Sequence, residues 1–348
     1  MITGWVFLFV ELAATNYQNL HPDSAITLTW PVFIFATVAV TTVGLLVGTI
    51  EMVWTEKRFR AYGLGLKVLY KSLLYLLFVM GILLITYPIA AMLELDVPIS
   101  DVAVWDKTRR FFLSITFLST LVQLSFSLSL SLLYAAISEN LGHQVLKNFF
   151  TGKYHQPRVE QRIFMFLDMK DSTAIAEQLG HVRYFELLSR YYEAMSDPII
   201  DSLGEVYQYI GDEVVVSWTL EHGQADANCL QCFFALKESL GDLKDTFEQV
   251  YGVVPDFRAG MHVGEVTTGE IGALKKEIVF TGDVLNTTAR LQSLTKEYHT
   301  DLLLSGDLIS LLNTSGKYEF DQLGTHSLRG KMEETLLFTV RDAQENVG

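Results

Sequence analysis

Two stretches near the middle of the chain decide the fold. Residues 162–173 read RIFMFLDMKDST, and residues 204–213 read GEVYQYIGDE. The first is an apolar run typical of a buried strand that ends in a carboxylate, and the second leads into a Gly-Asp turn between two strand-like segments. Between them, apolar spacing predicts a helix from about Ser172 to Leu203. This order predicts the beginning of an α+β sheet.

The sequence after this core continues to alternate between strand and helix patterns. We expect a helix over about 224–250, a strand over 256–266, a strand near Ile278, a helix over 284–298, and further strands with one helix up to Val340. Strand, helix, strand, strand, helix, strand is the ferredoxin-like order. Such a fold by itself does not define a function.

Long apolar runs occupy the first part of the chain. A helix that crosses the hydrocarbon core of a bilayer needs about 20 mostly apolar residues. Three runs reach that length, at Leu28 to Ile50, Leu66 to Leu93 and Phe111 to Ile137, and a shorter run from Gly4 to Ala14 could make a fourth. We therefore expect an α-helical transmembrane bundle of three or four spans.

Basic residues beside these runs predict the orientation of the bundle. Lys57, Arg58, Arg60 and Lys67 follow the first long run, whereas residues 15–26 contain no Lys or Arg. Because positively charged loops stay on the cytoplasmic side, we expect a multi-pass protein of the cell (inner or plasma) membrane whose C-terminal part is cytoplasmic. The expected parts are a transmembrane region at 1–138, a linker or transducer segment at 139–161 and a soluble domain at 162–348.

Charge and cysteine content exclude two classes of function. The formal net charge is −14, and no basic cluster is present, so we expect no nucleic-acid partner. Cys229 and Cys232 form a C-x-x-C, but no second pair of ligands at a suitable spacing completes a zinc site. Their spacing in an apolar helical stretch predicts a buried helix face.

Two carboxylates lie where strands end. Asp168 closes the first strand and Asp212 occupies the turn of the hairpin. In a ferredoxin-like sheet these positions are neighbours, so the two carboxylates could share a pair of hard cations that clamp the oxygens of a phosphoryl transfer. Gly211 would allow the hairpin to turn tightly.

A second polar group lies further along the chain. Asn286 and Arg290 are four residues apart in NTTAR, so they share one face of the predicted helix. Lys331, before the final strand, is a further candidate for contact with a triphosphate. On spacing alone, each of these residues could equally be a solvated surface side chain.

Three motifs in order resemble the catalytic domain of class III adenylate and guanylate cyclases. They are FLDMKDSTAIAE at 166–177, GEVYQYIGDE at 204–213 and TGDVLNTTARL at 281–291, and the resemblance covers about residues 160–340. The membrane half and linker resemble bacterial cyclases with N-terminal transmembrane helices. The resemblance implies a membrane-bound nucleotidyl cyclase in which the ribose 3′ oxygen attacks the α-phosphorus and pyrophosphate leaves.

The resemblance also implies roles for particular residues. It assigns catalysis to Asn286, Arg290 and Lys331, with Arg329 as the alternative to the lysine. It assigns two Mg²⁺ or Mn²⁺ ions per active site to Asp168, Met169 and Asp212. The implied substrate-binding residues are Gln208, Val279, Asp171, Ser172, Thr173 and Gly211. Because the metal-binding and the Asn/Arg sets come from different protomers in this family, a homodimer with shared active sites is implied.

Two positions depart from the family pattern and leave the base open. Gln208 stands where adenylate cyclases usually have Lys and guanylate cyclases Glu, and Val279 stands where a polar residue is common. Because Gln offers both a donor and an acceptor, it suits adenine or guanine. We favour ATP on the frequency of that substrate in the family, with GTP or a pyrimidine nucleotide as alternatives.

Two other functions compete with nucleotide cyclisation. A cyclase-like domain could act as a nucleotide-binding sensor or receptor without turnover, although both polar sets are present. A diguanylate cyclase also has a ferredoxin-like fold with metals at a hairpin, but its signature has a second Gly where Ile210 stands.

Overall fold

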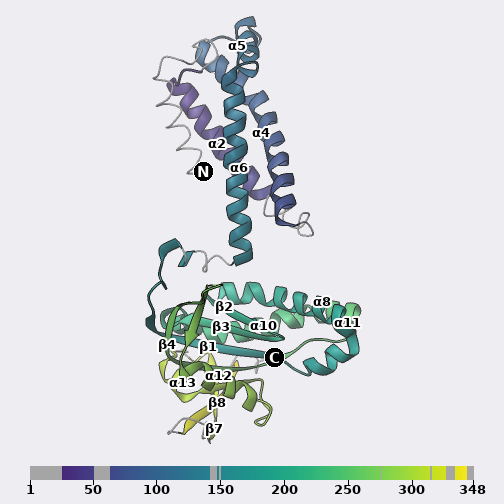
Figure 1. The fold of residues 1–348 in the computed structure, drawn as a ribbon, viewed down its shortest axis with the longest axis vertical. Coiled ribbons are helices and arrows are strands. Elements are labelled where there is room, and N and C mark those ends of the chain that lie inside the picture. The colour runs from purple at the N-terminus through teal and green to yellow at the C-terminus, as the bar shows by residue number, and fades with distance from the viewer. Residues whose placement is uncertain are drawn as a thin grey trace. The chain divides into compact units, whose positions relative to one another are not determined.

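The computed structural model describes residues 26–50, 63–141, 147–148, 150–274, 276–313, 316–326 and 334–342. The chain forms two compact units, Met1–Leu146 and Lys147–Gly348, whose elements are labelled in Figure 1. The short apolar run at 4–14 and the basic residues Lys57, Arg58 and Arg60 lie outside the described residues.

The N-terminal unit contains three helices that are long and apolar enough to cross a bilayer. They are Trp30–Ile50, Leu64–Leu95 and Thr120–Ser138. They belong to α2 (Trp30–Ile50), α4 (Leu64–Leu95) and α6 (Ile115–Leu141), and the short helix α5 (Val102–Phe112) lies between α4 and α6 in sequence. All three predicted apolar runs contain a long helix, but the third, Phe111 to Ile137, is interrupted, because α5 ends at Phe112 and α6 begins at Ile115.

Polar and aromatic contacts join the helices of this unit. Ser72 of α4 and Ser129 of α6 are within hydrogen-bonding distance, with their hydroxyl oxygens 3.2 Å apart. Near the other end of α4, Tyr87 stacks on Phe111 of α5 at a ring-centroid distance of 4.0 Å. Small hydroxyl side chains at helix contacts allow close approach in membranes, which fits the serine-rich composition of α6.

The C-terminal unit is a mixed sheet with helices on both faces (Figure 1). Its strands are β1 (Arg158–Met169), β2 (Glu205–Ile210), β3 (Glu213–Thr219), β4 (Phe257–Ile271), β5 (Glu277–Thr281), β6 (Leu302–Ser305), β7 (Tyr318–His326) and β8 (Thr335–Asp342). The order is β2-β3-β1-β4-β6-β8-β7, and β5 pairs with β4. β1, the strand that carries the first motif, therefore lies inside the sheet.

The two faces of β1 pack against different helices. Alternate residues of a strand point to opposite faces. Ile163, Met165 and Leu167 join the larger core with α8 (Ser172–Asp201) and α10 (Asn228–Asp242). Phe164 and Phe166 join a smaller core with α12 (Asp283–Leu294) on the other face. Asp168 has the same parity as the two phenylalanines, so it belongs to the α12 face.

The helix predicted over 224–250 is in fact divided. It consists of α9 (Leu220–Gln224), a 3-10 turn (Ala225–Ala227), α10, and α11 (Lys244–Tyr251), while α13 (Gly306–Leu311) follows β6. Asp226 and Ala227 have positive φ angles, which end the regular helix there. Cys229 and Cys232 are buried free thiols on α10, and burial raises the pKa of each to about 12.

The segment before β1 packs on the β4–β5 hairpin. The Tyr154 carbonyl accepts from the Glu270 N–H at 3.0 Å, and His155 Nδ1 lies 2.9 Å from a Glu270 carboxylate oxygen. Gly269 lies under Pro157, because a Cβ at that position would stand 3.4 Å from the proline Cα. The first strand accordingly begins at Arg158, earlier than residue 162.

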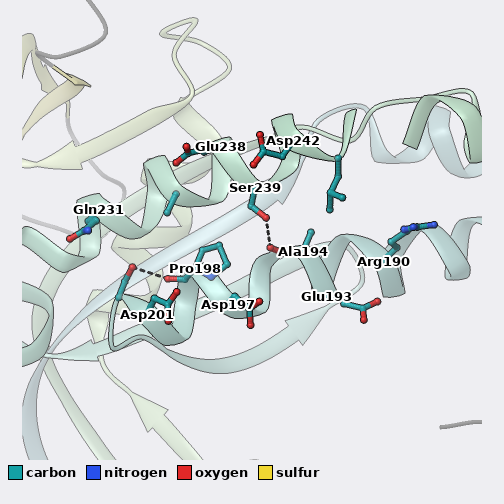
Figure 2. Close-up of a pocket in the computed structure, with 13 residues that line it drawn as sticks. Arg190, Glu193, Ala194, Asp197, Pro198, Asp201, Gln231, Glu238, Ser239 and Asp242 are labelled. Atoms are coloured by element: carbon teal, nitrogen blue, oxygen red, sulfur yellow. Dashed lines mark hydrogen bonds between the residues drawn. The ribbon is translucent and has the colours of Figure 1, made fainter. Parts of the chain in front are cut away.

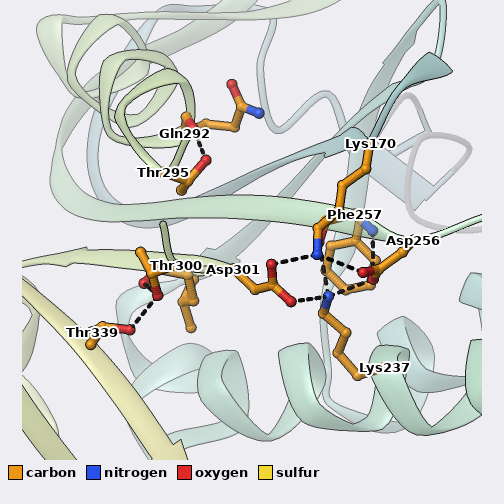
Figure 3. Close-up of polar contacts among 10 residues, drawn as sticks. Lys170, Lys237, Asp256, Phe257, Gln292, Thr295, Thr300, Asp301 and Thr339 are labelled. Atoms are coloured by element: carbon orange, nitrogen blue, oxygen red, sulfur yellow. Dashed lines mark hydrogen bonds and ion pairs between the residues drawn. The ribbon is translucent and has the colours of Figure 1, made fainter. Parts of the chain in front are cut away.

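Four charged side chains connect four segments of this unit (Figure 3). Lys170 lies 2.6 Å from Asp256 and 2.5 Å from Asp301, and Lys237 lies 2.5 and 2.8 Å from the same two carboxylates. Burial alone would raise the pKa of Asp256 and Asp301, but hydrogen bonds from the two lysines hold both values below normal. The turn after β1 is thereby tied to α10 and to the chain before β4 and β6.

α12 approaches the sheet at glycine positions. A Cβ on Gly260 of β4 would lie 2.3 Å from the Gln292 backbone nitrogen, and one on Gly264 would lie 3.0 Å from Val284 Cβ. A Cβ at Gly260 would overlap the α12 backbone, and a Cβ at Gly264 would require Val284 to shift, so these glycines set the depth of α12 on β4.

Replacing Gly260 tests this close approach. We expect Gly260→Ala to destabilise the protein by about 1–3 kcal/mol, because the new methyl group overlaps the α12 backbone. The thermal-unfolding midpoint of Gly260→Ala should therefore be several degrees lower than that of the wild type. Gly241→Ala on α10 is the matched control, since its Cβ meets nothing within 4 Å, and should be neutral or mildly stabilising. Thermal unfolding of the full chain in detergent measures both, and equal midpoints would contradict the argument.

Candidate active site

Asp168 lies at the C-terminal end of β1, beside two neighbouring strands. Leu167 pairs with Val214 of β3, and Asp168 itself pairs with Arg258 of β4. Residues that face each other across an antiparallel pair have their side chains on the same side. The register therefore places a cation beside this carboxylate.

Asp212 lies in the β2–β3 turn. Ile210 pairs with Glu213, which leaves Gly211 and Asp212 as the two turn residues. Gly211 has φ 66°, the left-handed conformation that glycine adopts without strain at the first central position of such a turn. The Tyr192 hydroxyl of α8 donates to the Gly211 carbonyl. The hairpin tip is thus held against α8.

The two carboxylates interact strongly. Burial, and then the charge of Asp212, raise the pKa of Asp168 to about 6, while Gln292 of α12 and Arg258 oppose the rise. Burial followed by the charges of these two aspartates also raises the pKa of Glu213. Neighbouring carboxylates with pKa values displaced from normal are typical of functional sites.

The arrangement of donor atoms suits a hard divalent cation. Oδ2 of Asp212 is buried and has no hydrogen-bond partner in the part of the chain that the structure describes. Carboxylate oxygens are the ligands that Mg²⁺ and Mn²⁺ prefer. Over those residues no group of three or more His, Cys, Asp or Glu side chains surrounds one metal position. The Met169 side chain is buried in the core, so that residue can offer only its main-chain carbonyl.

Arg258 is a site residue that the motifs did not reveal. It stands outside all three motifs, and only the β1–β4 register brings it opposite Asp168. A useful sequence signal would have been its position two residues before Gly260, at the start of the strand that runs beside β1. Its positive charge could bind an anionic group of a ligand held by the carboxylate pair.

Asn286 and Arg290 lie on α12 and, among the residues described, are not hydrogen-bonded to the two aspartates. Asn286 is exposed, and Nη1 of Arg290 is buried without a partner among the described residues. No hydrogen bond or ion pair within the described ranges joins either side chain to Asp168 or Asp212. One chain therefore presents two separate polar sets.

The strands that carry the two predicted base-reading positions, Gln208 and Val279, are joined by a hydrogen bond between the residues next to them. The Phe280 N–H, next to Val279, donates to the Tyr207 hydroxyl at 3.3 Å, and Tyr207 precedes Gln208. The Gln208 side chain is exposed on β2. The remaining predicted binding residues lie at the start of α8, where Asp171 has φ 55° and Ser172 and Thr173 open the helix. Lys331 and its alternative Arg329 lie outside the described residues.

A groove of about 760 Å³ lies elsewhere, between α8 and α10 (Figure 2). None of the predicted site residues lines it. At its base the Ser239 hydroxyl donates to the Ala194 carbonyl at 2.8 Å. Pro198 has no N–H and so leaves that carbonyl without its usual helical donor. This bond explains how α8 accommodates a proline.

The fold and the carboxylate pair at its hairpin define a class III nucleotidyl cyclase domain. Residues 154–341 match the family model described as the adenylate and guanylate cyclase catalytic domain. The chain belongs to that family, as its motifs indicated.

Similar proteins agree with this assignment. Adenylate cyclase 2 of Rhizobium meliloti (strain 1021) is 34% identical over 204 residues, which are 59% of this chain and 56% of that protein. Adenylate cyclase 1 of the same organism is 30% identical over 191 residues, 53% of this chain and 27% of that protein. The chain thus spans about half or less of the length of these relatives.

A solved structure shares the fold. A bacterial light-regulated adenylyl cyclase aligns with a TM-score of 0.54 and 21% identity, over 63% of this chain and 64% of that one. The predicted order of an N-terminal apolar helical region followed by an α+β cyclase domain is therefore confirmed.

The carboxylate pair makes a prediction about pH. The pKa of Asp168 is about 6 in the fold, above its normal 3.8. Folding therefore favours the protonated form, and the associated stability is fully present below pH 4 and lost as the pH rises through about 6. In metal-free protein at pH 7.5 we expect Asp168→Asn to raise the unfolding midpoint by a few degrees.

Thermal unfolding of the full chain in detergent with EDTA measures this effect. The gain should shrink toward pH 4, where the wild-type carboxyl is already protonated. Glu238→Gln, which removes an exposed carboxylate on α10, is the control and should change the midpoint little. A lower midpoint for Asp168→Asn at pH 7.5 would show that the carboxylate stabilises the empty site.

Proposed function

We propose that this chain is a membrane-anchored adenylate cyclase that converts ATP to 3′,5′-cyclic AMP and pyrophosphate. The observation that carries the proposal is the pair of mutually repelling carboxylates, Asp168 and Asp212, in a domain of this family. Similarity to proteins named adenylate cyclase favours ATP over other nucleotides. A domain that only bound a nucleotide, without catalysing a reaction, would not need two carboxylates side by side, an arrangement that costs electrostatic free energy.

The metal site is formed by Asp168, the Met169 carbonyl and Asp212. Two Mg²⁺ or Mn²⁺ ions bound there would activate the ribose 3′ hydroxyl and neutralise charge on the phosphates. Because the protein supplies few ligands, phosphate oxygens of the substrate would have to supply the others. Arg258, opposite Asp168, adds positive charge beside the anionic substrate.

The remaining residues orient the substrate. Ser172 and Thr173 present backbone N–H groups at the N-terminus of α8, a favourable place for phosphate oxygens, and Asp171 and Gly211 shape the adjoining turns. Asn286 orients the ribose, while Arg290 and Lys331 stabilise charge that develops as pyrophosphate leaves. Gln208 and Val279 contact the base.

We further propose a homodimer with two shared sites. Within one chain, Asn286 and Arg290 make no hydrogen bond to the metal-binding aspartates, and Arg290 has a buried nitrogen without a partner among the described residues. Both observations fit a site in which the second copy supplies the Asn/Arg pair.

The helices α2, α4 and α6 have the length and composition of membrane spans. We propose that they anchor the chain in the cell membrane as a multi-pass protein, with the cyclase domain after residue 162 on the cytoplasmic side. Residues 139–161 then connect the two parts as a linker. The bilayer and the nucleoside triphosphate are its proposed partners.

Activity of membranes containing the full chain tests the reaction. With Mn²⁺ and each of ATP, GTP, CTP and UTP, we expect cyclic AMP and pyrophosphate from ATP, and activity that sediments with the membranes. Asp168→Ala and Asp212→Ala should each reduce it at least about 100-fold, because losing a metal ligand removes several kcal/mol of charge stabilisation. A folded chain that binds ATP but forms no product would instead support a nucleotide sensor.

Co-expression tests the shared site. Asp212→Ala and Arg290→Ala should each be inactive when expressed alone, because each homodimer then lacks one component of both sites. Expressed together, they should recover up to about one quarter of wild-type activity, since a mixed dimer contains one intact site. Chromatographic quantification of the product is the measurement, and two copies of the same variant are the control. Absence of recovery in co-purified mixed dimers would rule out sharing.

A further inference from the structure

We propose that the Tyr207 hydroxyl donates a hydrogen bond to the adenine ring of the substrate and replaces the polar group that position 279 lacks. The inference rests on the proposed function, because it places the base beside Gln208 and Val279. Tyr207 stands in the second motif, but the family resemblance assigned it no role.

The position of Tyr207 results from an irregularity in β2. Val206 pairs with Val216 and Gln208 pairs with Val215, so Tyr207 is an extra residue without a partner in the ladder. Such a bulge redirects a side chain. Here the ring lies against β5, with its centroid 4.7 Å from that of Phe280.

The hydroxyl connects the two strands that carry the proposed base-reading positions, β2 with Gln208 and β5 with Val279. The Phe280 N–H donates to the Tyr207 oxygen at 3.3 Å, and this is the one hydrogen bond of that hydroxyl within the described ranges. A tyrosine hydroxyl can both accept and donate, so its own proton remains available. Tyr207 precedes Gln208, and Phe280 follows Val279, so the available donor is one residue from each.

Surrounding contacts fix the tyrosine ring. Phe164 packs edge-on against Phe280 at a centroid distance of 5.5 Å, and the Arg162 guanidinium lies 4.8 Å from the same ring. Arg162 is buried and held by Glu205 at 2.6 Å and by the Ser217 hydroxyl at 3.1 Å. These contacts restrict the movement of Phe280, and the Tyr207 ring that packs on Phe280 is therefore held in place.

The available donor distinguishes adenine from guanine. N1 of adenine accepts a hydrogen bond and its exocyclic amino group donates, whereas N1 of guanine carries a proton. The Tyr207 hydroxyl can donate to adenine N1 while the Gln208 carbonyl oxygen accepts from the amino group. Guanine N1 carries a proton and so offers no acceptor for the Tyr207 hydroxyl proton. Val279 supplies apolar contact alone.

A comparison of two substrates with two variants tests this contact. The substrates are ATP and 1-deaza-ATP, in which C–H replaces N1. Full-length wild type, Tyr207→Phe and the control Tyr209→Phe are assayed in membranes. Tyr209 lies two residues further along β2 and undergoes the same chemical change.

We expect Tyr207→Phe to lower kcat/KM for ATP about 10-fold, chiefly through KM, because one hydrogen bond to the base is lost. Wild type should lose a similar factor with 1-deaza-ATP, whereas Tyr207→Phe should use the two substrates within about 2-fold of each other. Tyr209→Phe should behave as wild type does. Only a direct contact between the hydroxyl and N1 produces this non-additive pattern.

Three results would overturn the inference. They are equal use of ATP and 1-deaza-ATP by wild type, unchanged kcat/KM for ATP in a folded Tyr207→Phe, and a Tyr207→Phe variant that remains as sensitive to 1-deaza-ATP as wild type. The first needs no variant, so it stands even if Tyr207→Phe fails to fold. Wild type that cyclises no nucleotide overturns the proposed function instead, and preference for GTP overturns the adenine assignment alone.

Discussion

The electrostatic repulsion between Asp168 and Asp212 is the constraint on which the rest of the catalytic unit depends. Burial of Asp168, and then the negative charge of Asp212 beside it, raise the pKa of Asp168 to about 6, so holding the ionised carboxylate in this place costs free energy. The fold maintains this arrangement with rigid elements. β1 is paired on both sides, the hairpin tip is hydrogen-bonded to Tyr192, and Lys170 ties the following turn to two aspartates. Divalent cations would relieve this repulsion. The relief would add to the free energy of metal binding.

The helix on the other face is positioned by the absence of side chains. Gly260 lets α12 lie against β4 more closely than any residue with a Cβ would permit, and Gly264 allows a tight contact with Val284. At that depth Gln292 reaches Asp168, while Asn286 stays exposed. One helix thus contacts Asp168 of its own chain through Gln292 and presents Asn286 to solvent. A division of this kind suits a site completed by a second copy.

The proposed metal site and the proposed base-reading residues belong to different parts of the sheet. The carboxylates lie at the end of β1 and at the β2–β3 turn, whereas Gln208, Tyr207 and Phe280 belong to the middle of β2 and to β5. The bulge in β2 affects the second region without altering the hairpin register that holds Asp212. Under the proposed assignment, changes of a few side chains on β2 and β5 would alter base preference and leave the two carboxylates in place.

The sequence by itself determined the element types, the three long apolar helices and the family, because these follow from local periodicity and from motifs whose residues are close in the chain. It also placed Asp168 and Asp212 together, since a hairpin beside the first strand leaves little choice. Only the tertiary structure decided which residues meet across strands. Arg258 faces Asp168 through the β1–β4 register, and Tyr207 meets Phe280 through a bulge and contacts 73 residues apart. Neither follows from local propensity, because register and bulges are set by packing between segments distant in sequence. The break between α10 and α11 was missed because apolar spacing continues across Leu243, whose backbone leaves the helical conformation.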